Sequence, residues 1–478
     1  MRIFLFPWPI DKEEYVEAIS DLQNAGHEIV YWVSVFGELD KLRPKFPNTI
    51  FHDHLEAGFC KPAIGLESVW EPPPADLIKQ LYKVESLILT MMNKRFDWMC
   101  VDERKHLYYQ FLGYWSQILK KYQPDFIIFP GVPHTVYDYL VYELAKLWNI
   151  KTLIFENTVV TDRLLFIADF RKGSEALQMA LLKNKNQKFT LNDLEQDLQE
   201  YYYMQTDADC DATPPYLKDN RRYFRLDKVL KRKILDGLRD FSIFRKTLRY
   251  IFKKLFRNIQ KEYKKIQKKP DWTKKFVYFP LHFQPESAIS PHGDIFADQI
   301  LAIETLSAAL PEDWVVFVKE HPVQWFHFGV NFTSSKYRNY YKKIAEIPNV
   351  NVVPIETDTY QLINKSQAVA TITGTAIWEA FFREKPAMFF GYPWYQDCPC
   401  IFRVNDIESC RLALTQIIQG YKPSKQEVIN FLKSLEEATV QGYFEEYGKR
   451  GSKLSLKEST QNFVRIILEE IQNLRYNS

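Results

Sequence analysis

Three short polar segments in the second half of the chain contain the residues best suited to chemistry. They are Gln284–Ser287, Lys319–Pro322 and Thr373–Thr375, and each follows an apolar stretch typical of a buried strand. In the third segment, Gly374 permits a tight turn into a helix, whose free N–H groups and flanking threonine hydroxyls favour an anion such as a phosphate. Glu379, one turn further on, places a carboxylate within reach of a ribose hydroxyl. The alternative is that the threonine only caps the helix and the glutamate is solvated.

Together these segments provide the groups that a transfer from a phosphate-linked donor requires. Lys319 and His321 supply positive charge or N–H groups for the phosphates without a metal ion. Glu286 is the candidate general base for an acceptor hydroxyl. A core histidine at position 321 and a loop cap at position 286 are the structural alternatives. We expect Glu286 and His321 to be catalytic. The expected donor-binding residues are Gln284, Ser287, Lys319, Thr373, Gly374, Thr375 and Glu379.

The elements that position these residues read as a second α/β unit after Lys269-Pro270. A strand over 368–373, a helix over 375–383 and a strand over 387–390 form a βαβ pattern, which requires a parallel sheet. The same alternation precedes it. We expect strands over 276–279, 315–319 and 351–354, and helices over 298–310, 336–346 and 359–365.

The chain opens with a similar pattern. Strands over 3–6 and 28–33 flank a helix over about 12–25, as in a Rossmann-like unit. The turn after the first strand is Pro7-Trp8-Pro9, without the GxGxxG motif, so a dinucleotide site is not indicated. Two helical patterns follow at about 75–93 and 103–122.

Two further candidates lie at predicted strand ends of this first unit. The strand over 125–129 leads to His134, and the strand over 151–155 leads to Glu156. Because sites in open α/β sheets lie at the carboxyl ends of strands, these two residues are weaker candidates for the acceptor side. A structural role is the alternative for both.

Residues 221–269 form a strongly basic segment. They contain 19 Lys and Arg against 4 Asp and Glu, a local net charge of +15 in a chain whose net charge is only +3. An apolar stripe at helical spacing runs through the segment, which fits an anionic membrane surface. A nucleic-acid partner is not expected because base-stacking motifs are absent, and a solvated helix packed through its stripe is the alternative. The stripe is formed by Phe244, Leu248, Ile251, Phe252, Leu255 and Ile259.

Composition limits the remaining possibilities. The 478 residues are 46% hydrophobic and 15% aromatic, which indicates a folded protein of two or three domains. Six cysteines without a CxxC pair favour reduced thiols, no apolar run is long enough to span a membrane, and the N-terminus does not read as a signal peptide. We therefore expect a cytoplasmic protein, peripheral at the inner face of the cytoplasmic membrane.

Asp207, Asp209 and Asp211 resemble a metal-binding DxD pair, but a capping loop before Pro214 explains them equally well, and we expect no metal. The predicted fold is α/β, with two Rossmann-like domains and a helical basic insertion between them. The expected domains are residues 1–170, 171–269 (the insertion), 270–423 and 424–478 (helices that pack back on both domains).

The motifs KEHP at 319–322, QPES at 284–287 and ITGTAIWEAFFREKPAMFFG at 372–391 resemble the capsule polysaccharide biosynthesis family. That family includes β-Kdo transferases, and the resemblance is best over about 275–395. It implies a GT-B fold, in which two Rossmann-like domains face a cleft, the first (1–170) for the acceptor and the second (270–423) for the nucleotide-sugar. In such a fold the HP histidine, here His321, contacts the donor phosphate. The resemblance also implies a carboxylate base in the preceding loop, where Glu286 lies. Kdo transferases use aspartate in a QxxxD pattern, whereas Gln284 lies two residues before Glu286.

The resemblance implies a metal-independent glycosyltransferase of bacterial capsule or lipopolysaccharide biosynthesis, without a cofactor. Its donor would be a CMP-, CDP- or UDP-linked sugar, with Kdo as one candidate. The acceptor would be a glycan or a lipid-linked glycan, and transfer would invert the anomeric centre. The same segments are similar to CDP-glycerol glycerophosphotransferases and to UDP-GlcNAc 2-epimerases, which remain alternatives. A non-catalytic glycan-binding or assembly protein is a third.

Overall fold

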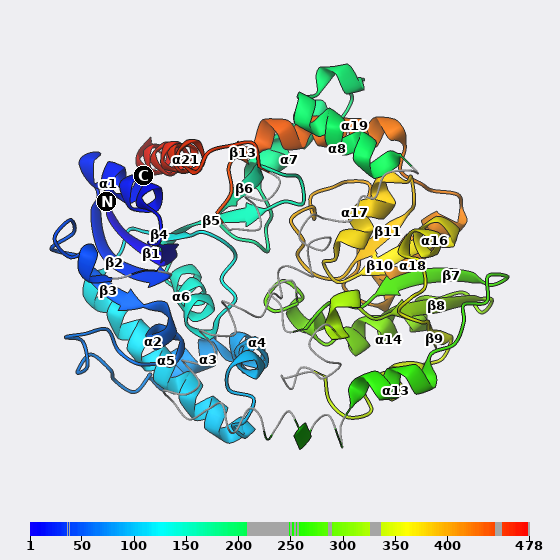
Figure 1. Cartoon of the computed structure of the whole chain (residues 1–478), viewed down its shortest axis with the longest axis horizontal. Coiled ribbons are helices and arrows are strands. Elements are labelled where there is room, and N and C mark those ends of the chain that lie inside the picture. Colours follow the sequence, from blue (N-terminus) through cyan, green and yellow to red (C-terminus); the bar gives the residue numbers. More distant parts are fainter. Residues whose placement is uncertain are drawn as a thin grey trace. The chain divides into compact units, whose positions relative to one another are not determined.

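The structure is a computed structural model that describes residues 1–35, 37, 39–207, 248, 251–252, 255, 258–284, 289–325, 336–444 and 452–476. These residues divide into two compact units (Figure 1). The first comprises 1–188, 290–292 and 430–478, and the second comprises 189–289 and 293–429. The predicted site residues Glu286 and Ser287, the aspartates at 209 and 211, and most of the basic segment lie outside the described residues.

The first unit is built on a seven-stranded sheet with the order β13-β6-β5-β4-β1-β2-β3. The five strands from β1 to β5 are parallel, whereas β6 pairs antiparallel with β5 and with β13. The predicted Rossmann-like opening is therefore present, with an antiparallel edge added. The strands are β1 (Arg2–Pro9), β2 (Glu28–Val35), β3 (Ile50–Asp53), β4 (Phe126–Phe129), β5 (Lys151–Asn157), β6 (Arg163–Ile167) and β13 (Val440–Gln441).

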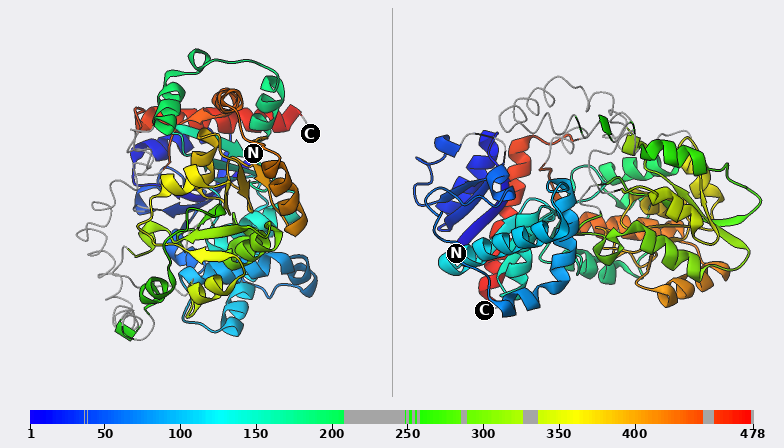
Figure 2. Two further views of the ribbon diagram at one scale, coloured as in Figure 1. Left: turned by 90° about the vertical axis from the view of Figure 1, so that its right-hand side faces the viewer. Right: turned by 90° about the horizontal axis from the view of Figure 1, so that it is seen from below.

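Alternate residues of β1 point to opposite faces of this sheet, and helices cover both faces. On one face, Ile3 and Leu5 join a core that includes residues of α1 and α21, two helices that lie side by side (Figure 2). On the other face, the ring of Phe6 lies 5.3 Å from that of Trp115 in α5. The helices of the unit are α1 (Glu13–Asn24), α2 (His54–Gly58), α3 (Ala75–Gln80), α4 (Tyr82–Met91), α5 (Val101–Tyr122), α6 (Val136–Leu147), α7 (Glu175–Asn184) and α21 (Leu456–Tyr476), with 3-10 turns η1 (Leu39–Lys41) and η2 (Met92–Lys94).

The second unit is built on a six-stranded sheet in which every pairing is parallel, in the order β12-β11-β10-β7-β8-β9. The chain proceeds outward from β7 to β9, then returns to add β10 on the other side of β7. The strand order thus reverses between β7 and β10, the place where open α/β sheets bind ligands. The strands are β7 (Lys275–Pro280), β8 (Trp314–Lys319), β9 (Val350–Val352), β10 (Ala368–Thr371), β11 (Ala387–Phe389) and β12 (Phe402–Arg403).

The helices of the second unit follow the predicted alternation. The predicted helix over 336–346 begins at Tyr340, and the predicted strand over 368–373 ends at Thr371. The helices are α8 (Gln196–Thr206), α13 (Ile259–Ile266), α14 (Gln299–Ala309), α15 (Tyr340–Glu346), α16 (Thr359–Lys365), α17 (Thr375–Phe382) and α18 (Ile407–Ile418), with 3-10 turns η3 (Leu191–Asp193), η4 (Asp294–Ala297) and η5 (Pro322–Trp325).

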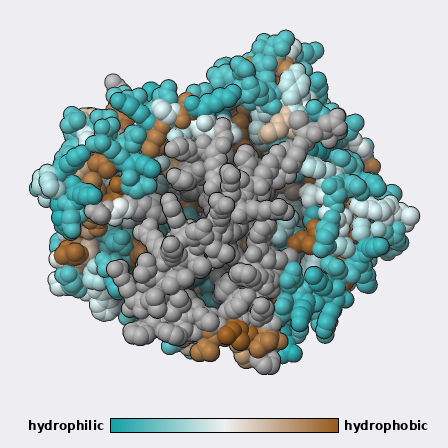
Figure 3. Space-filling model, viewed as in Figure 1, coloured by the Kyte–Doolittle hydropathy of each residue, from teal (hydrophilic) through white to brown (hydrophobic). Residues whose placement is uncertain are grey.

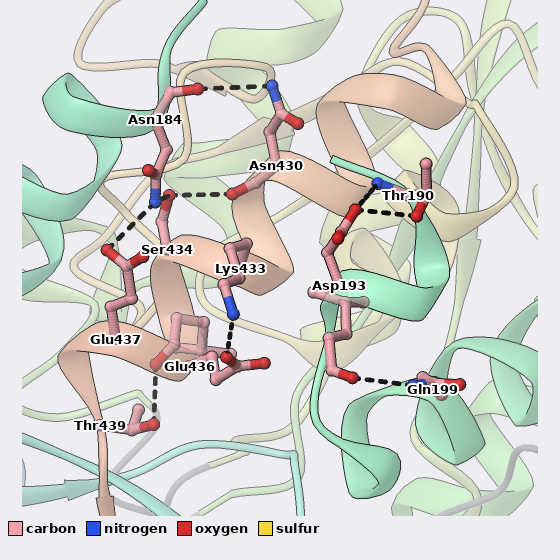
Figure 4. A network of polar contacts seen from close by, with 12 residues as sticks. Asn184, Thr190, Asp193, Gln199, Asn430, Lys433, Ser434, Glu436, Glu437 and Thr439 are labelled. Carbon is pink, nitrogen blue, oxygen red and sulfur yellow. Dashed lines mark hydrogen bonds and ion pairs between the residues drawn. The ribbon is translucent and has the colours of Figure 1, made fainter. Parts of the chain in front are cut away.

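Helix α19 (Lys425–Ala438) contains the point at which the chain passes from the second unit back to the first. Its later part is fixed to α7 by polar contacts (Figure 4). The Asn184 side-chain amide donates to the Ser434 hydroxyl at 3.2 Å and to Glu437 at 3.3 Å. Because Asn184 and Ser434 are buried, these hydrogen bonds specify where α19 joins the first unit.

Candidate functional site

The described residues of the three polar segments identified from the sequence follow strands whose carboxyl ends lie at one edge of the second sheet. Strand β7 lies between β10 and β8, and all three run parallel. The residues that follow Pro280, Lys319 and Thr371 therefore emerge on the same side of the sheet, next to the reversal of strand order.

A histidine that the sequence analysis did not single out connects two of these segments. The Thr373 backbone N–H donates to Nε2 of His282 at 3.2 Å, and the Thr371 hydroxyl lies 2.9 Å from the same nitrogen. Because Nε2 accepts, the neutral ring carries its proton on Nδ1. The His282 backbone N–H donates to Gln299 at 2.8 Å. His282 thereby fixes the turn between β10 and α17, and its position directly after an apolar strand was the available signal.

Gly374 is the N-cap residue of α17, and among the described residues no side chain caps this helix. Thr375 is therefore the first helical residue rather than the cap. A Cβ atom on Gly374 would lie 3.0 Å from the Thr371 hydroxyl and 3.3 Å from a ring carbon of His282. The Tyr395 hydroxyl holds the turn from the other side by donating to the Gly374 carbonyl at 2.7 Å. The close approach, rather than a positive φ, explains glycine here.

Lys319 is only 4% exposed, and hydrogen bonds fix its ammonium group. Its Nζ atom donates to the Thr357 carbonyl at 2.6 Å and to the Thr359 hydroxyl at 2.7 Å. Burial lowers the pKa of Lys319 to about 8, although Asp358 and Glu379 oppose the shift. On α17, burial raises the pKa of Glu379 to about 7, against the effects of Arg383 and Lys319.

His321 lies on a loop that a buried ion pair holds in place. The His321 backbone N–H donates to Oε1 of Glu320 at 2.7 Å, while Oε2 of Glu320 binds both Lys336 and the Tyr341 hydroxyl. The side chains of Lys336 and Glu320 are fully buried. The Glu320 backbone N–H also donates to the hydroxyl of Tyr263 in α13 at 3.1 Å. Sequence reasoning gave Glu320 no role and missed Lys336, which lies 16 residues further along the sequence.

The His321 ring is neutral near pH 7. Burial lowers its pKa to about 4, and the charges of Lys336 and Lys319 lower it further. Of the two contributions expected from this residue, a neutral ring retains one N–H group and carries no positive charge. Gln284 is also buried in this region. Its backbone N–H donates to Gln324 at 3.2 Å, and its side-chain oxygen has no hydrogen-bond partner among the described residues.

In the first unit, His134 follows β4 and Glu156 lies at the carboxyl end of β5. His134 Nδ1 donates to the Val132 carbonyl at 2.9 Å, and burial lowers its pKa to about 4, with a contribution from Lys94. Glu156 Oε1 lies 3.9 Å from Nε2 of His292, which comes from the short segment 290–292. The sequence analysis missed His292 because nothing local marks a return of the chain to the first unit.

Among the described residues, no group of three or more His, Cys, Asp or Glu side chains could hold a metal ion. Asp207, the one member of the DxD run that the structure describes, is the C-cap of α8. No helix of the described part is both long enough and apolar enough to cross a membrane.

Residues 193–403 match a family model described as capsule polysaccharide biosynthesis protein. This is the family that the sequence motifs resemble. The match confirms that resemblance over residues 193–403, which include the second sheet and all three polar segments. None of the curated proteins compared with the chain matches it.

Several solved structures show distant similarity. The β-Kdo 2,7 transferase of KpsC from Thermosulfurimonas dismutans is 11% identical, with 73% of this chain and 88% of that chain covered and a TM-score of 0.34. UDP-GlcNAc 2-epimerase from Methanocaldococcus jannaschii is 11% identical, with coverage of 98% and 100% and a TM-score of 0.26. The spinosyn rhamnosyltransferase SpnG is 9% identical, with coverage of 92% and 96% and a TM-score of 0.25. At these scores, the fold assignment rests on the strand order of the two sheets.

Proposed function

We propose that the protein is a glycosyltransferase of bacterial surface polysaccharide biosynthesis, of GT-B type and independent of metal ions. It transfers a sugar from a nucleotide-sugar to a glycan or lipid-linked acceptor with inversion, and Kdo is one candidate sugar. One observation carries the proposal. The described residues of the three polar segments follow β7, β8 and β10, next to the point where the strand order of a parallel sheet reverses, and they lie within the residues that match the capsule polysaccharide biosynthesis family model.

The beginning of α17 suits the phosphates of a CMP-, CDP- or UDP-linked donor. Its first N–H groups lack a side-chain cap among the described residues, and Thr373 and Thr375 add hydroxyls on either side of Gly374. Glu379 follows one turn later and is suited to a ribose hydroxyl. His321, two residues after the end of β8, carries a neutral ring with one N–H group, and Gln284 and Ser287 belong to the first of the three polar segments.

The proposed reaction is a single displacement. The acceptor hydroxyl attacks the anomeric carbon while the bond from that carbon to the phosphate oxygen breaks, so the configuration inverts. Glu286 takes the hydroxyl proton, and the N–H groups at the start of α17 stabilise the charge on the departing nucleotide phosphate. The assignment of Glu286 rests on the family resemblance and on its place in the Gln284–Ser287 segment.

We further propose that the basic segment 221–269 contacts an anionic membrane surface, and that the protein is cytoplasmic and peripheral. The described residues of its apolar stripe divide into two groups. Ile259 is buried in α13, as is Tyr263 of the same helix, which does not belong to the stripe. Leu248, Ile251, Phe252 and Leu255 are exposed, whereas most of the described surface in Figure 3 is hydrophilic. Packing of the stripe onto the domain therefore accounts for Ile259 at its end. It does not account for the exposed residues, which we assign to the membrane contact.

A thermal-shift screen with CMP, CDP, UDP and GDP tests the proposal, since a ligand that binds only the folded state raises Tm by mass action. We expect one of these nucleotides to raise Tm, and its sugar conjugate to transfer label to a glycan acceptor. Incubation with the donor alone excludes the epimerase alternative, because only an epimerase converts its donor to an isomer. If no nucleotide raises Tm, the transferase proposal is wrong.

A further inference from the structure

Glu156 and His292 face each other in the first unit at a distance that leaves room for one more atom. Oε1 of Glu156 lies 3.9 Å from Nε2 of His292, and their side chains are 13% and 11% exposed. That separation is too long for a direct hydrogen bond. Nε2 of His292 is buried and has no hydrogen-bond partner among the described residues. Buried polar atoms are almost always satisfied, so this nitrogen points to an absent partner.

The gap has the dimensions of a single oxygen atom. An oxygen placed about 2.8 Å from both atoms would hydrogen-bond to each, at an angle between the two bonds of about 90°. A hydroxyl group satisfies both partners at once, because it donates one hydrogen bond and accepts others. The ring of Phe170 lies 5.5 Å from the His292 ring and provides an apolar wall beside the gap.

Both groups are uncharged near pH 7, which favours a neutral ligand. Burial raises the pKa of Glu156 to about 8, so its carboxyl group can donate a proton to a hydrogen bond. Burial lowers the pKa of His292 to about 3, with a contribution from His134, so its ring is neutral and can accept. A donor and an acceptor without net charge match a hydroxyl better than a carboxylate or a phosphate.

We propose that Glu156 and His292 together bind one hydroxyl group of a sugar, with Glu156 as the donor and His292 as the acceptor. Glu156 lies at the carboxyl end of β5, which pairs in parallel with β4, and open parallel sheets generally bind ligands at this edge. The inference rests on the proposed function, in which the first unit takes the acceptor glycan. It adds His292 to the site and assigns both residues to recognition of the acceptor.

The test uses NMR of the full-length protein labelled with 15N-histidine, with D-glucose, D-galactose and N-acetyl-D-glucosamine as probes. Loss of one ring signal in His292→Phe identifies His292. We expect at least one probe to shift the His292 signals in a saturable way. Glu156→Leu removes the donor and should weaken that binding about tenfold or more, whereas Glu156→Gln keeps an amide donor and should retain binding within about threefold. The matched control is His106→Phe, which alters an exposed histidine of α5 and should leave binding unchanged.

Two results would overturn the inference. One is that no probe moves the His292 signals, which would mean that the gap holds only water. The other is that Glu156→Leu binds the sugar as tightly as the unchanged protein. In either case, a nucleotide that still raises Tm would leave the transferase proposal standing. If nucleotides also fail, the proposed function falls with the inference. Glu156→Gln, which keeps the size and shape of the side chain, preserves the test if Glu156→Leu does not fold.

Discussion

At the scale of single residues, burial sets the protonation of the candidate site. It lowers the pKa of Lys319 to about 8 and of His321 to about 4, and it raises the pKa of Glu379 to about 7. Each shift favours the uncharged form. Near pH 7 the His321 ring is therefore uncharged whereas Lys319 remains mostly protonated, so nucleotide binding should depend on hydrogen-bond geometry as well as on charge. That geometry depends on buried supports such as Glu320 and Lys336.

The support beneath His321 can be tested through Lys336. Replacing it in Lys336→Ala leaves Glu320 buried without its ion-pair partner, which should lower the free energy of unfolding by about 3–5 kcal/mol. Lys342→Ala is the control, because Lys342 and Glu346 form a pair in which both side chains are 61% exposed, and its effect should stay below about 1 kcal/mol. Urea unfolding measures both. Equal losses for the two variants would contradict a supporting role for the buried pair.

Glu379 should give the stability a characteristic dependence on pH. Its pKa rises from 4.5 to about 7 on folding, so between these values the folded state binds more protons than the unfolded state. The contribution of Glu379 to the free energy of unfolding is therefore constant below pH 4.5, falls as the pH rises to about 7, and is level above that. We expect Glu379→Gln to remove this fall and to stabilise the protein at pH 8 by about 1–3 kcal/mol. Urea unfolding across this pH range provides the measurement.

The control for the pH experiment is Glu304→Gln, because Glu304 is exposed on α14. That variant should reproduce the pH profile of the unchanged protein. A Glu379→Gln profile that keeps the same fall between pH 4.5 and pH 7 would show that other groups cause it.

The sequence predicts some of these residues and not others for a physical reason. Gly374 and Thr375 are visible because a strand, a turn and a helix follow one another locally. The contacts of His282 with Thr371 and of Lys336 with Glu320 join residues distant in the sequence, and no local pattern contains them. His292 is the extreme case, since only the folded chain brings it to Glu156.

At the scale of elements, the unit β10–α17–β11 is predicted correctly because its pattern of apolar residues is pronounced. Apolar runs form the strands, an apolar helix lies between them, and β10 and β11 pair in parallel as expected. Weak patterns fail. The two-residue β13 pairs antiparallel with β6 at the edge of the first sheet, and nothing in its sequence distinguishes it from a loop. The helical pattern over 75–93 is interrupted at Leu81, which separates α3 from α4.

The turn before α17 offers a prediction at this scale. In Gly374→Ala, the added Cβ lies 3.0 Å from the Thr371 hydroxyl, so the turn or the His282 contact must shift. We expect a loss of about 1–3 kcal/mol in the free energy of unfolding and at least about tenfold weaker nucleotide binding. Calorimetric titration with the nucleotide found in the thermal-shift screen measures the binding.

Gly131→Ala is the matched control for this turn, because nothing lies within 4 Å of a Cβ at that position. It should preserve both stability and nucleotide affinity. If Gly374→Ala binds the nucleotide as tightly as Gly131→Ala does, then the start of α17 does not bind the phosphate.

At the scale of the whole molecule, the chain contains two sheets that share a strand order. In both, the first three strands pair side by side in sequence order, and the fourth pairs with the first on its other side. The resulting orders are β3-β2-β1-β4-β5 and β9-β8-β7-β10-β11-β12. Alternating strand and helix patterns in the sequence predict two α/β units with parallel sheets, but they do not give this strand order. The basic segment 221–269 follows neither pattern, and its charge and apolar stripe, rather than its fold, support the membrane proposal.

The exposed part of that stripe gives the last prediction. The double variant Leu248→Ser, Leu255→Ser removes two side chains that are 69% and 68% exposed, so the fold should tolerate it. If these residues enter a bilayer, the variant should partition about tenfold or more weakly into vesicles that contain anionic lipid, as measured by co-sedimentation. The control, Met179→Ser, Leu182→Ser, alters side chains on α7 that are 66% and 76% exposed, and it should bind vesicles normally.

Salt and lipid charge separate the two contributions to this binding. Because the surrounding segment carries a net charge of +15, high salt or purely zwitterionic vesicles should weaken binding of the unchanged protein. If high salt weakens binding of the unchanged protein but the Leu248→Ser, Leu255→Ser variant binds normally, the contact is purely electrostatic. The apolar stripe would then not enter the membrane. Equal losses in that variant and in the α7 control would indicate a general effect of surface hydrophobicity. Only a loss specific to the stripe and sensitive to lipid charge supports an amphipathic contact with the membrane.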